Sequence, residues 1–114
     1  MNYQPDYWKI IKIEYNGDTL YKLLGHWVGG YARGESWRLN SGITKITFCE
    51  EFNLYKVYGE SGSVYHCLAT NEHISGYMHS LMDGFRYRIE SDGDDATMEF
   101  VDLEEVDYEN WNCE

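Results

Sequence analysis

Apolar and polar residues alternate with a period of two over the first part of the chain. Residues 8–15 (WKIIKIEY) and 19–28 (TLYKLLGHWV) flank Asn16-Gly17-Asp18. An Asn-Gly pair tolerates the positive φ angles of a tight hairpin turn, and period-two alternation is typical of strands. The pattern therefore predicts an antiparallel hairpin over residues 8–28.

A further strand and a second hairpin are predicted in the middle of the chain. Residues 43–49 (ITKITFC) are rich in the β-branched side chains that favour strands. Residues 53–58 and 63–68 flank the glycine-containing turn GESG at 59–62, which predicts another hairpin.

The acidic turn SDGD at 91–94 predicts a third hairpin between residues 85–89 and 97–101. The pattern after this turn is less decisive. Residues 97–106 are compatible with a strand or with a helix, and both alternatives stay open.

One stretch has the period of a helix. Five apolar residues fall at i, i+3, i+4, i+7 and i+8 and share one face: Ile74, Tyr77, Met78, Leu81 and Met82. Thr70 is the expected N-cap, and Gly84 is the expected C-terminal stop. The apolar stripe should pack against the sheet.

Together these patterns predict an α+β fold, in which one α-helix packs on an antiparallel sheet of five to seven strands joined as hairpins or a meander. The chain has 114 residues, which is the size of a single domain, so we expect one domain over residues 1–114. Hydrophobic residues make up 43% and aromatic residues 17%, which excludes a disordered acidic protein.

The net charge of −11 is confined to the last 25 residues. Residues 1–89 contain nine acidic and nine basic side chains, whereas the acidic segment 90–114 contains eleven acidic side chains and no Lys, Arg or His. A block of one sign repels other anions and attracts basic surfaces. Direct nucleic-acid binding is disfavoured, because it needs a basic surface.

The acidic segment predicts a binding surface for a basic protein, such as a nucleic-acid-handling protein. Alternate residues of a strand lie about 6.6 to 7 Å apart, close to the phosphate spacing along one DNA strand, so carboxylates there could mimic a polyanion. The expected partner-binding residues are Asp92, Asp94, Asp95, Glu99, Asp102, Glu104 and Glu105.

Residues 26–42 combine glycines, aromatic rings and two arginines, and they suggest an alternative function. Glycine gives backbone freedom, and aromatic and guanidinium planes stack on flat ligands, so the segment could bind a nucleotide or another small ligand. The residues expected to do so are Trp27, Tyr31, Arg33, Trp37, Arg38, Asn40 and Ser41. The competing interpretation is a strand connection in which Trp37 fills the core, and no GxGxxG or GxxxxGK[ST] motif is present.

Metal binding and catalysis have little support. The candidate zinc ligands are His26, His66, His73, His79, Cys49 and Cys67. His66 and Cys67 are neighbours on a predicted strand and would point to opposite faces, and no pair has the spacing of structural zinc sites. Residues 92–95 (DGDD) lack EF-hand spacing and are expected to form a solvated turn. We therefore expect no catalytic residues, metal or cofactor.

The cysteine count and the N-terminal residues bear on location. Cys49, Cys67 and Cys113 are an odd number without a CxxC pair, and residues 1–6 (MNYQPD) lack the basic and apolar regions of a secretion signal. No apolar run approaches the roughly 18 residues of a membrane span. We expect reduced thiols, a cytoplasmic protein and no membrane contact. The oligomeric state is not predicted.

Two stretches resemble segments of small uncharacterised proteins of tailed phages, particularly phages of cyanobacteria. They are residues 34–43 (GESWRLNSGI) and 59–65 (GESGSVY), and the resemblance covers about a third of the chain. The resemblance transfers no catalytic residue. It implies a phage setting in the host cytoplasm, where small acidic proteins often bind and disable host or defence proteins, and an inhibitor of this kind is the expected function.

Overall fold

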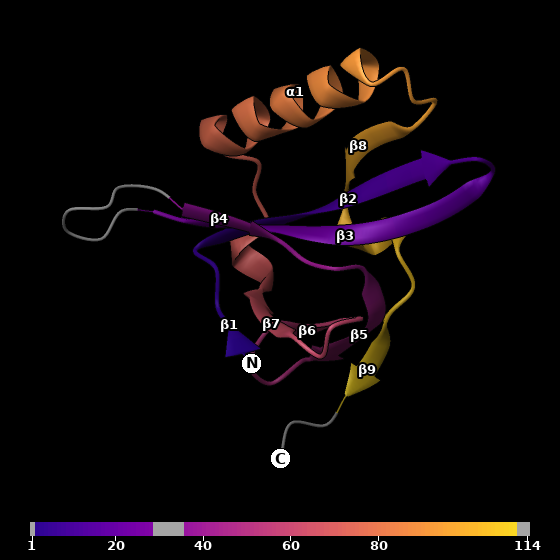
Figure 1. The fold of residues 1–114 in the computed structure, drawn as a ribbon. Helices are drawn as coiled ribbons and strands as arrows, with labels where there is room; N and C mark the ends of the chain where they lie inside the picture. The colour runs from indigo at the N-terminus through magenta and orange to yellow at the C-terminus, as the bar shows by residue number, and fades with distance from the viewer. Residues whose placement is uncertain (1, 29–35, 112–114) are drawn as a thin grey trace.

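The computed structural model of the chain describes residues 2–28 and 36–111 (Figure 1). Within these ranges it contains nine strands, one α-helix and two short 3₁₀ turns. The strands are β1 (Asn2–Tyr3), β2 (Tyr7–Tyr15), β3 (Asp18–Trp27), β4 (Ser36–Leu39), β5 (Ile43–Cys49), β6 (Leu54–Gly59), β7 (Val64–Leu68), β8 (Thr97–Val101) and β9 (Glu109–Trp111). The helix is α1 (Gly76–Ser91), and the 3₁₀ turns are η1 (Ala69–Asn71) and η2 (Leu103–Glu105).

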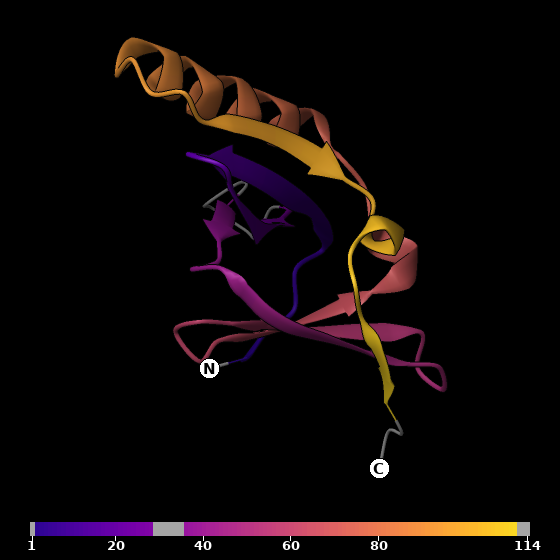
Figure 2. The same ribbon diagram turned by 90° about the vertical axis from the view of Figure 1, so that its right-hand side faces the viewer.

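The α+β class, with mainly antiparallel pairing and one helix, is confirmed. The strands form two sheets rather than one, with the orders β1-β7-β6-β5-β9 and β4-β3-β2-β8. Two short pairs are parallel, β1 with β7 and β5 with β9. The helix, the four-stranded sheet and the five-stranded sheet follow one another as three layers (Figure 2).

The division into three layers follows from β2, which is apolar on both faces. Trp8 and Ile10 point into the core between the two sheets, together with Val57 and Tyr65 of the five-stranded sheet. Ile11 points to the other face, where it packs against Met78 and Met82 of α1. A strand buried on both faces needs a covering layer on each side, so a single sheet with one helix would leave one face of β2 exposed.

The first two predicted hairpins are confirmed. In the first, Tyr15 pairs with Asp18 across Asn16 and Gly17, whose φ angles are +51° and +82°. Both values lie in the left-handed region that Asn and Gly tolerate, as expected for a tight hairpin turn. The second hairpin joins β6 to β7.

The predicted boundaries of the helix are wrong at both ends. The N-cap is Ser75, whose Oγ accepts a hydrogen bond from the backbone N–H of Met78 at 3.2 Å, and not Thr70. The helix also continues through Gly84 to Ser91. A mid-helix glycine costs only about 1 kcal/mol, which burial of the apolar stripe outweighs.

The third predicted hairpin is therefore wrong, because residues 85–89 belong to α1. The sequence FRYRI at 85–89 alternates like a strand, but Phe85 and Ile89 also lie four residues apart and extend the helical stripe. β8 pairs antiparallel with β2 instead, with Glu14 opposite Thr97 and Ile10 opposite Val101. Residues 97–106, for which both a strand and a helix were open, form the strand β8 followed by the 3₁₀ turn η2.

The cysteines differ from the expectation of three reduced thiols. Cys49 is disulfide-bonded, while Cys67 is free and buried. Burial raises the pKa of the Cys67 thiol well above its ordinary value, so this thiol stays protonated and unreactive. In the described part of the chain, no helix has the length and apolar character needed to cross a bilayer.

Candidate functional site

Exposed carboxylates follow the chain from the end of α1, along β8, to the residues after η2. All seven predicted partner-binding residues are exposed, and two more acids of the same segment join them. We call this set the acidic edge: Glu90, Asp92, Asp94, Asp95, Glu99, Asp102, Glu104, Glu105 and Asp107. It borders the outer strand of the four-stranded sheet, since β8 pairs with β2 and with no other described strand.

The carboxylates do not form the regular row that was predicted. β8 carries a single acidic residue, Glu99, so the expected match to DNA phosphate spacing along a strand is not present. The acids gather instead at the two ends of β8. Asp92, Asp94 and Asp95 lie before the strand, and the acids of η2 and its flanks lie after it.

The group before β8 includes acids from the first half of the chain. Glu14 and Asp18, near the tip of the β2–β3 hairpin, line with Asp95 a hollow of about 300 Å³, the hairpin hollow. Sequence reasoning missed Glu14 and Asp18 because the β2–β8 pairing joins residues more than eighty positions apart. A hairpin tip that is predicted from sequence does not indicate which other segment of the chain lies beside it.

A second hollow, the helix hollow, lies between the end of α1 and β8. It measures about 430 Å³ and combines the apolar side chains of Ile89 and Met98 with the carboxylates of Glu90 and Asp94. Arg86 also lines it, and its guanidinium donates hydrogen bonds to the carbonyl oxygen of Met98 from Nε (3.0 Å) and Nη2 (2.7 Å). One backbone hydrogen-bond acceptor of the outer strand β8 is therefore already used by Arg86.

Asp102 has a structural role as well as an exposed position. Its Oδ1 lies 2.5 Å from Nζ of Lys9, which also contacts Oε2 of Glu72 at 3.1 Å. The Lys9 side chain is 9% exposed. Burial alone would lower the pKa of Lys9, but the hydrogen bonds with Asp102 and Glu72 outweigh it and the pKa is raised. This Lys9 triad fixes the acidic edge to β2.

Two other members of the acidic edge also have partners. Oε2 of Glu105 accepts a hydrogen bond from the backbone N–H of Asp102 at 3.0 Å. Glu99 lies opposite Lys12, whose pKa is raised chiefly by its hydrogen bond with Glu14. By contrast, six carboxylates of the edge make no hydrogen bond or ion pair within residues 2–28 and 36–111: Glu90, Asp92, Asp94, Asp95, Glu104 and Asp107. These six are the free charges of the edge.

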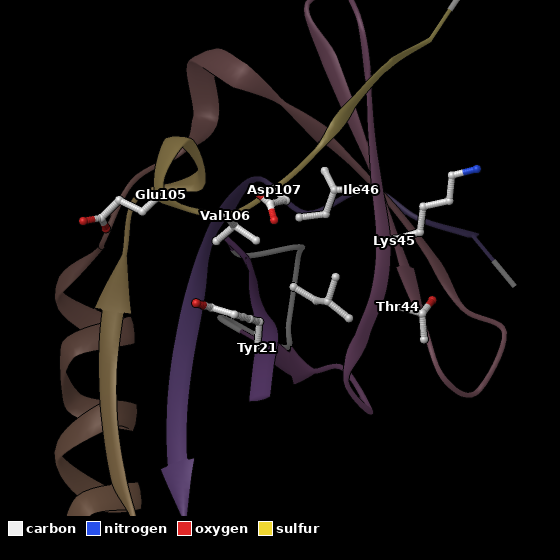
Figure 3. A pocket seen from close by; sticks show the side chains of 8 residues that line it. Tyr21, Thr44, Lys45, Ile46, Glu105, Val106 and Asp107 are labelled. Carbon is white, nitrogen blue, oxygen red and sulfur yellow. The ribbon is translucent and has the colours of Figure 1, made fainter. Parts of the chain in front are cut away.

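A third hollow, the η2 hollow, lies at the other end of the edge, between the two sheets (Figure 3). It measures about 280 Å³, and its lining includes Tyr21, Ile43, Ile46, Val106 and Asp107. Ile46 is buried at 3% exposure, whereas Asp107 is exposed. Three hollows thus adjoin the acidic edge, and each has at least one carboxylate at its wall.

The residues that were expected to bind a small ligand do not all lie together in the structure. Trp27, Trp37 and Arg38 line with Tyr3 a hollow of about 370 Å³, and the Arg38 guanidinium lies 4.5 Å from the centre of the Tyr3 ring. The Trp37 ring, however, packs against Phe85 of α1 with centroids 5.5 Å apart, so consecutive side chains of β4 contact different layers. Trp37 is 43% exposed and does not fill the core.

The remaining residues of that set are structural or lie outside the described ranges. Asn40 is buried and bonds twice to Leu23, through its backbone N–H and through its side-chain Oδ1. Ser41 bonds to Ser61 of the β6–β7 turn. Tyr31 and Arg33 are not among the described residues.

The four histidines, Cys49 and Cys67 do not gather at one place in the described part of the chain. Within the described residues, no group of three or more His, Cys, Asp or Glu is arranged to hold a metal ion. His26 is buried, with Nδ1 2.8 Å from Ser75 Oγ and its ring stacked on Tyr77 at 4.6 Å, so it supports the start of α1. Burial and nearby Lys56 lower the pKa of His66.

Comparison with protein-family models, with curated proteins and with solved structures found no match to this chain.

Proposed function

We propose that the protein binds a basic surface of another protein through the acidic edge, and that by occupying this surface it inhibits a nucleic-acid-handling protein. The observation that carries the proposal is the group of exposed free carboxylates that have no partner among the described residues: Glu90, Asp92, Asp94, Asp95, Glu104 and Asp107. A free exposed carboxylate keeps its full field for an incoming cation, whereas an ion-paired one does not. The phage setting implied by the resemblance makes a host or defence protein the expected target.

The three hollows favour a protein as the partner of the acidic edge, rather than small counter-ions alone. Apolar residues such as Ile89 and Met98 lie directly beside Glu90 and Asp94 in the helix hollow. Protein interfaces combine a desolvated apolar centre with a polar rim, and this hollow offers both on a small scale. Long basic side chains fit such places because their stems are apolar and their heads are charged.

The proposal can be tested by displacement of DNA. Each member of a panel of purified basic DNA-binding domains is first bound to a fluorescent duplex, and the protein is then added while anisotropy is followed. We expect displacement from one or more members, weakening steeply between low and physiological salt, because the Debye length falls from about 30 Å at 0.01 M to about 8 Å at 0.15 M.

Matched charge variants separate the acidic edge from net charge. Asp92→Asn, Asp94→Asn and Asp95→Asn combined should weaken displacement by about tenfold at low salt. Glu50→Gln, Glu51→Gln and Glu60→Gln combined remove the same charge from exposed turns of the other sheet and should have a much smaller effect. Equal effects of the two triple variants, or no displacement from any member of the panel, would contradict the proposal.

A second function remains as a proposal because Tyr3, Trp27 and Arg38 line an open hollow. A guanidinium stacked on an aromatic ring beside an indole could hold a planar anionic ligand such as a nucleotide. The structure favours this less than the acidic edge, since Arg38 already uses one of its faces on the Tyr3 ring. A nucleotide retained in native mass spectra of the purified protein, and lost in Arg38→Ala, would support it.

A further inference from the structure

Aliphatic side chains form one part of the wall of the η2 hollow, and the polar side chains of Thr44, Lys45, Glu105 and Asp107 form the rest. Ile43, Ile46 and Val106 line it, and Tyr21 adds an aromatic ring. Ile46 belongs to the core between the two sheets, and Ile43, Val106 and Tyr21 pack against that core, so the walls are held by the fold rather than by a loose loop. Figure 3 shows the side chains of Ile46 and Val106 on opposite sides of Asp107, with the Tyr21 ring beyond Val106.

The polar groups around this hollow leave one carboxylate available to it. Figure 3 shows Glu105 pointing away to the far side of η2, where its Oε2 accepts the hydrogen bond from Asp102. Lys45 points away in the opposite direction, and its Nζ lies 5.9 Å from the centre of the Tyr58 ring. Asp107 makes no ion pair or hydrogen bond within the described residues, so no described cation neutralises its charge.

We infer that the η2 hollow receives the side chain of a lysine from the basic partner. The inference rests on the proposed function and names the anchor within that surface. The four-carbon stem would contact Ile43, Ile46 and Val106, and the ammonium would pair with Asp107 near the Tyr21 ring. A lysine suits the site because an aliphatic stem gains from apolar walls and a compact ammonium needs only one carboxylate.

Arginine fits the same chemistry less well. A guanidinium gains most from a carboxylate that it can meet with two parallel hydrogen bonds and from an aromatic face on which its plane can stack. Among the described residues that line this hollow, Asp107 is the acid directed to it, because Glu105 points away (Figure 3). The longer four-carbon stem of lysine gains more than the three-carbon stem of arginine from contact with Ile43, Ile46 and Val106.

The inference can be tested with small probes on the intact protein. Nα-acetyl-lysine amide is titrated while methyl NMR signals of Ile43, Ile46 and Val106 are followed. We expect saturable shifts confined to these methyls. Nα-acetyl-norleucine amide has the same stem without the ammonium and should bind about fivefold more weakly, the difference that a partly exposed ion pair of about 1 kcal/mol makes.

A matched pair of variants separates the site from the general field. Asp107→Asn should weaken binding of the lysine probe by about fivefold. Asp94→Asn, an equal charge change at the helix hollow, should weaken this binding by less than about twofold. Both residues are exposed, so neither change should affect folding. Equal effects of the two variants, shifts spread over the surface, or tighter binding of Nα-acetyl-arginine amide would overturn the inference.

The outcomes for this site and for the proposed function are distinguishable. If the DNA-displacement experiment fails while the lysine probe still shifts the η2 methyls, the anchor site exists but the proposed function is wrong. If displacement succeeds and depends on Asp92, Asp94 and Asp95 but the lysine probe leaves the η2 methyls unchanged, the acidic edge binds its partner without this anchor.

Discussion

Lys9 shows at the scale of single residues how the acidic segment is joined to the rest of the protein. Its ammonium is buried and contacts one carboxylate from the loop before α1, Glu72, and one from the acidic edge, Asp102. Glu72 also accepts a hydrogen bond from the backbone N–H of Leu103 at 2.8 Å. A buried cation with two carboxylates is stable only while both partners remain in place.

Replacing Lys9 should therefore destabilise the protein. Lys9→Met is expected to lower the free energy of unfolding by about 1 to 3 kcal/mol, less than for a fully buried pair, because the Asp102 side chain is 70% exposed. Chemical denaturation measures the loss. Lys12→Met is the matched control, since the Lys12–Glu14 pair is more exposed and solvent screens it, so its loss should change stability much less. Equal losses in the two variants would contradict a special role for Lys9.

The same residue makes a prediction about pH. The pKa of Lys9 is raised above its ordinary value of 10.5, so the folded state holds this proton more tightly than the unfolded chain does. The stability that the triad contributes is complete below pH 10.5 and is lost as the pH rises through the folded-state pKa. The difference in unfolding free energy between wild type and Lys9→Met should thus shrink above pH 10.5, and a constant difference would argue against the ion pairs as its source.

At the scale of elements, α1 owes its start to a side chain that the sequence pattern did not identify. Ser75 caps the helix by accepting the hydrogen bond from Met78, and its hydroxyl also contacts buried His26. The helix then places Met78 and Met82 against Ile11 and Leu24 of the four-stranded sheet. The cap therefore fixes the register with which the apolar stripe meets β2 and β3.

Removal of the cap should weaken the helix. Ser75→Ala is expected to cost about 1 kcal/mol, within the range of about 0.5 to 2 kcal/mol for lost N-caps, and hydrogen exchange should accelerate first at the N-terminal turn of α1. Thr70→Ala tests the cap predicted from sequence. Thr70 is exposed and caps nothing in α1, so the change should stay within about 0.5 kcal/mol. A larger effect of Thr70→Ala than of Ser75→Ala would show that the assigned helix start is wrong.

At the scale of the whole molecule, the two sheets share one core. Trp8, Ile10 and Leu23 of the four-stranded sheet pack with Ile46 and Val57 of the five-stranded sheet. Leu103 of η2 is fully buried in this core. The chain should therefore unfold as a unit although its strands form separate sheets, because neither sheet can expose this face without the other.

Leu103→Ala tests this coupling. The change should cost about 2 to 5 kcal/mol, the range for deleting a large buried aliphatic side chain. The transition followed by helical circular dichroism, which reports α1, should coincide with that followed by methyl NMR of Val57, which reports the five-stranded sheet. Two separated transitions, or a shift of one alone, would contradict a single core.

The charge distribution and the local elements were determined by the sequence. All of the net charge lies after residue 89. The Asn16-Gly17 turn and the alternation of apolar and polar residues around it identified the β2–β3 hairpin. The apolar stripe around Met78 identified the helix. Each of these signals depends on neighbours within a few residues, where backbone geometry and side-chain period are linked directly.

Tertiary structure decided which of the acidic side chains are free and what lies beside them. The pairing of β8 with β2 brings Asp95 to Glu14 and Asp18, the buried position of Lys9 engages Asp102, and the packing of two sheets creates the hollow beside Asp107. No local pattern encodes these contacts, because strand pairing joins segments far apart in the chain and is selected by the burial of both faces of β2. The sequence determined that the segment is acidic, and the packing of layers determined where its charge can act.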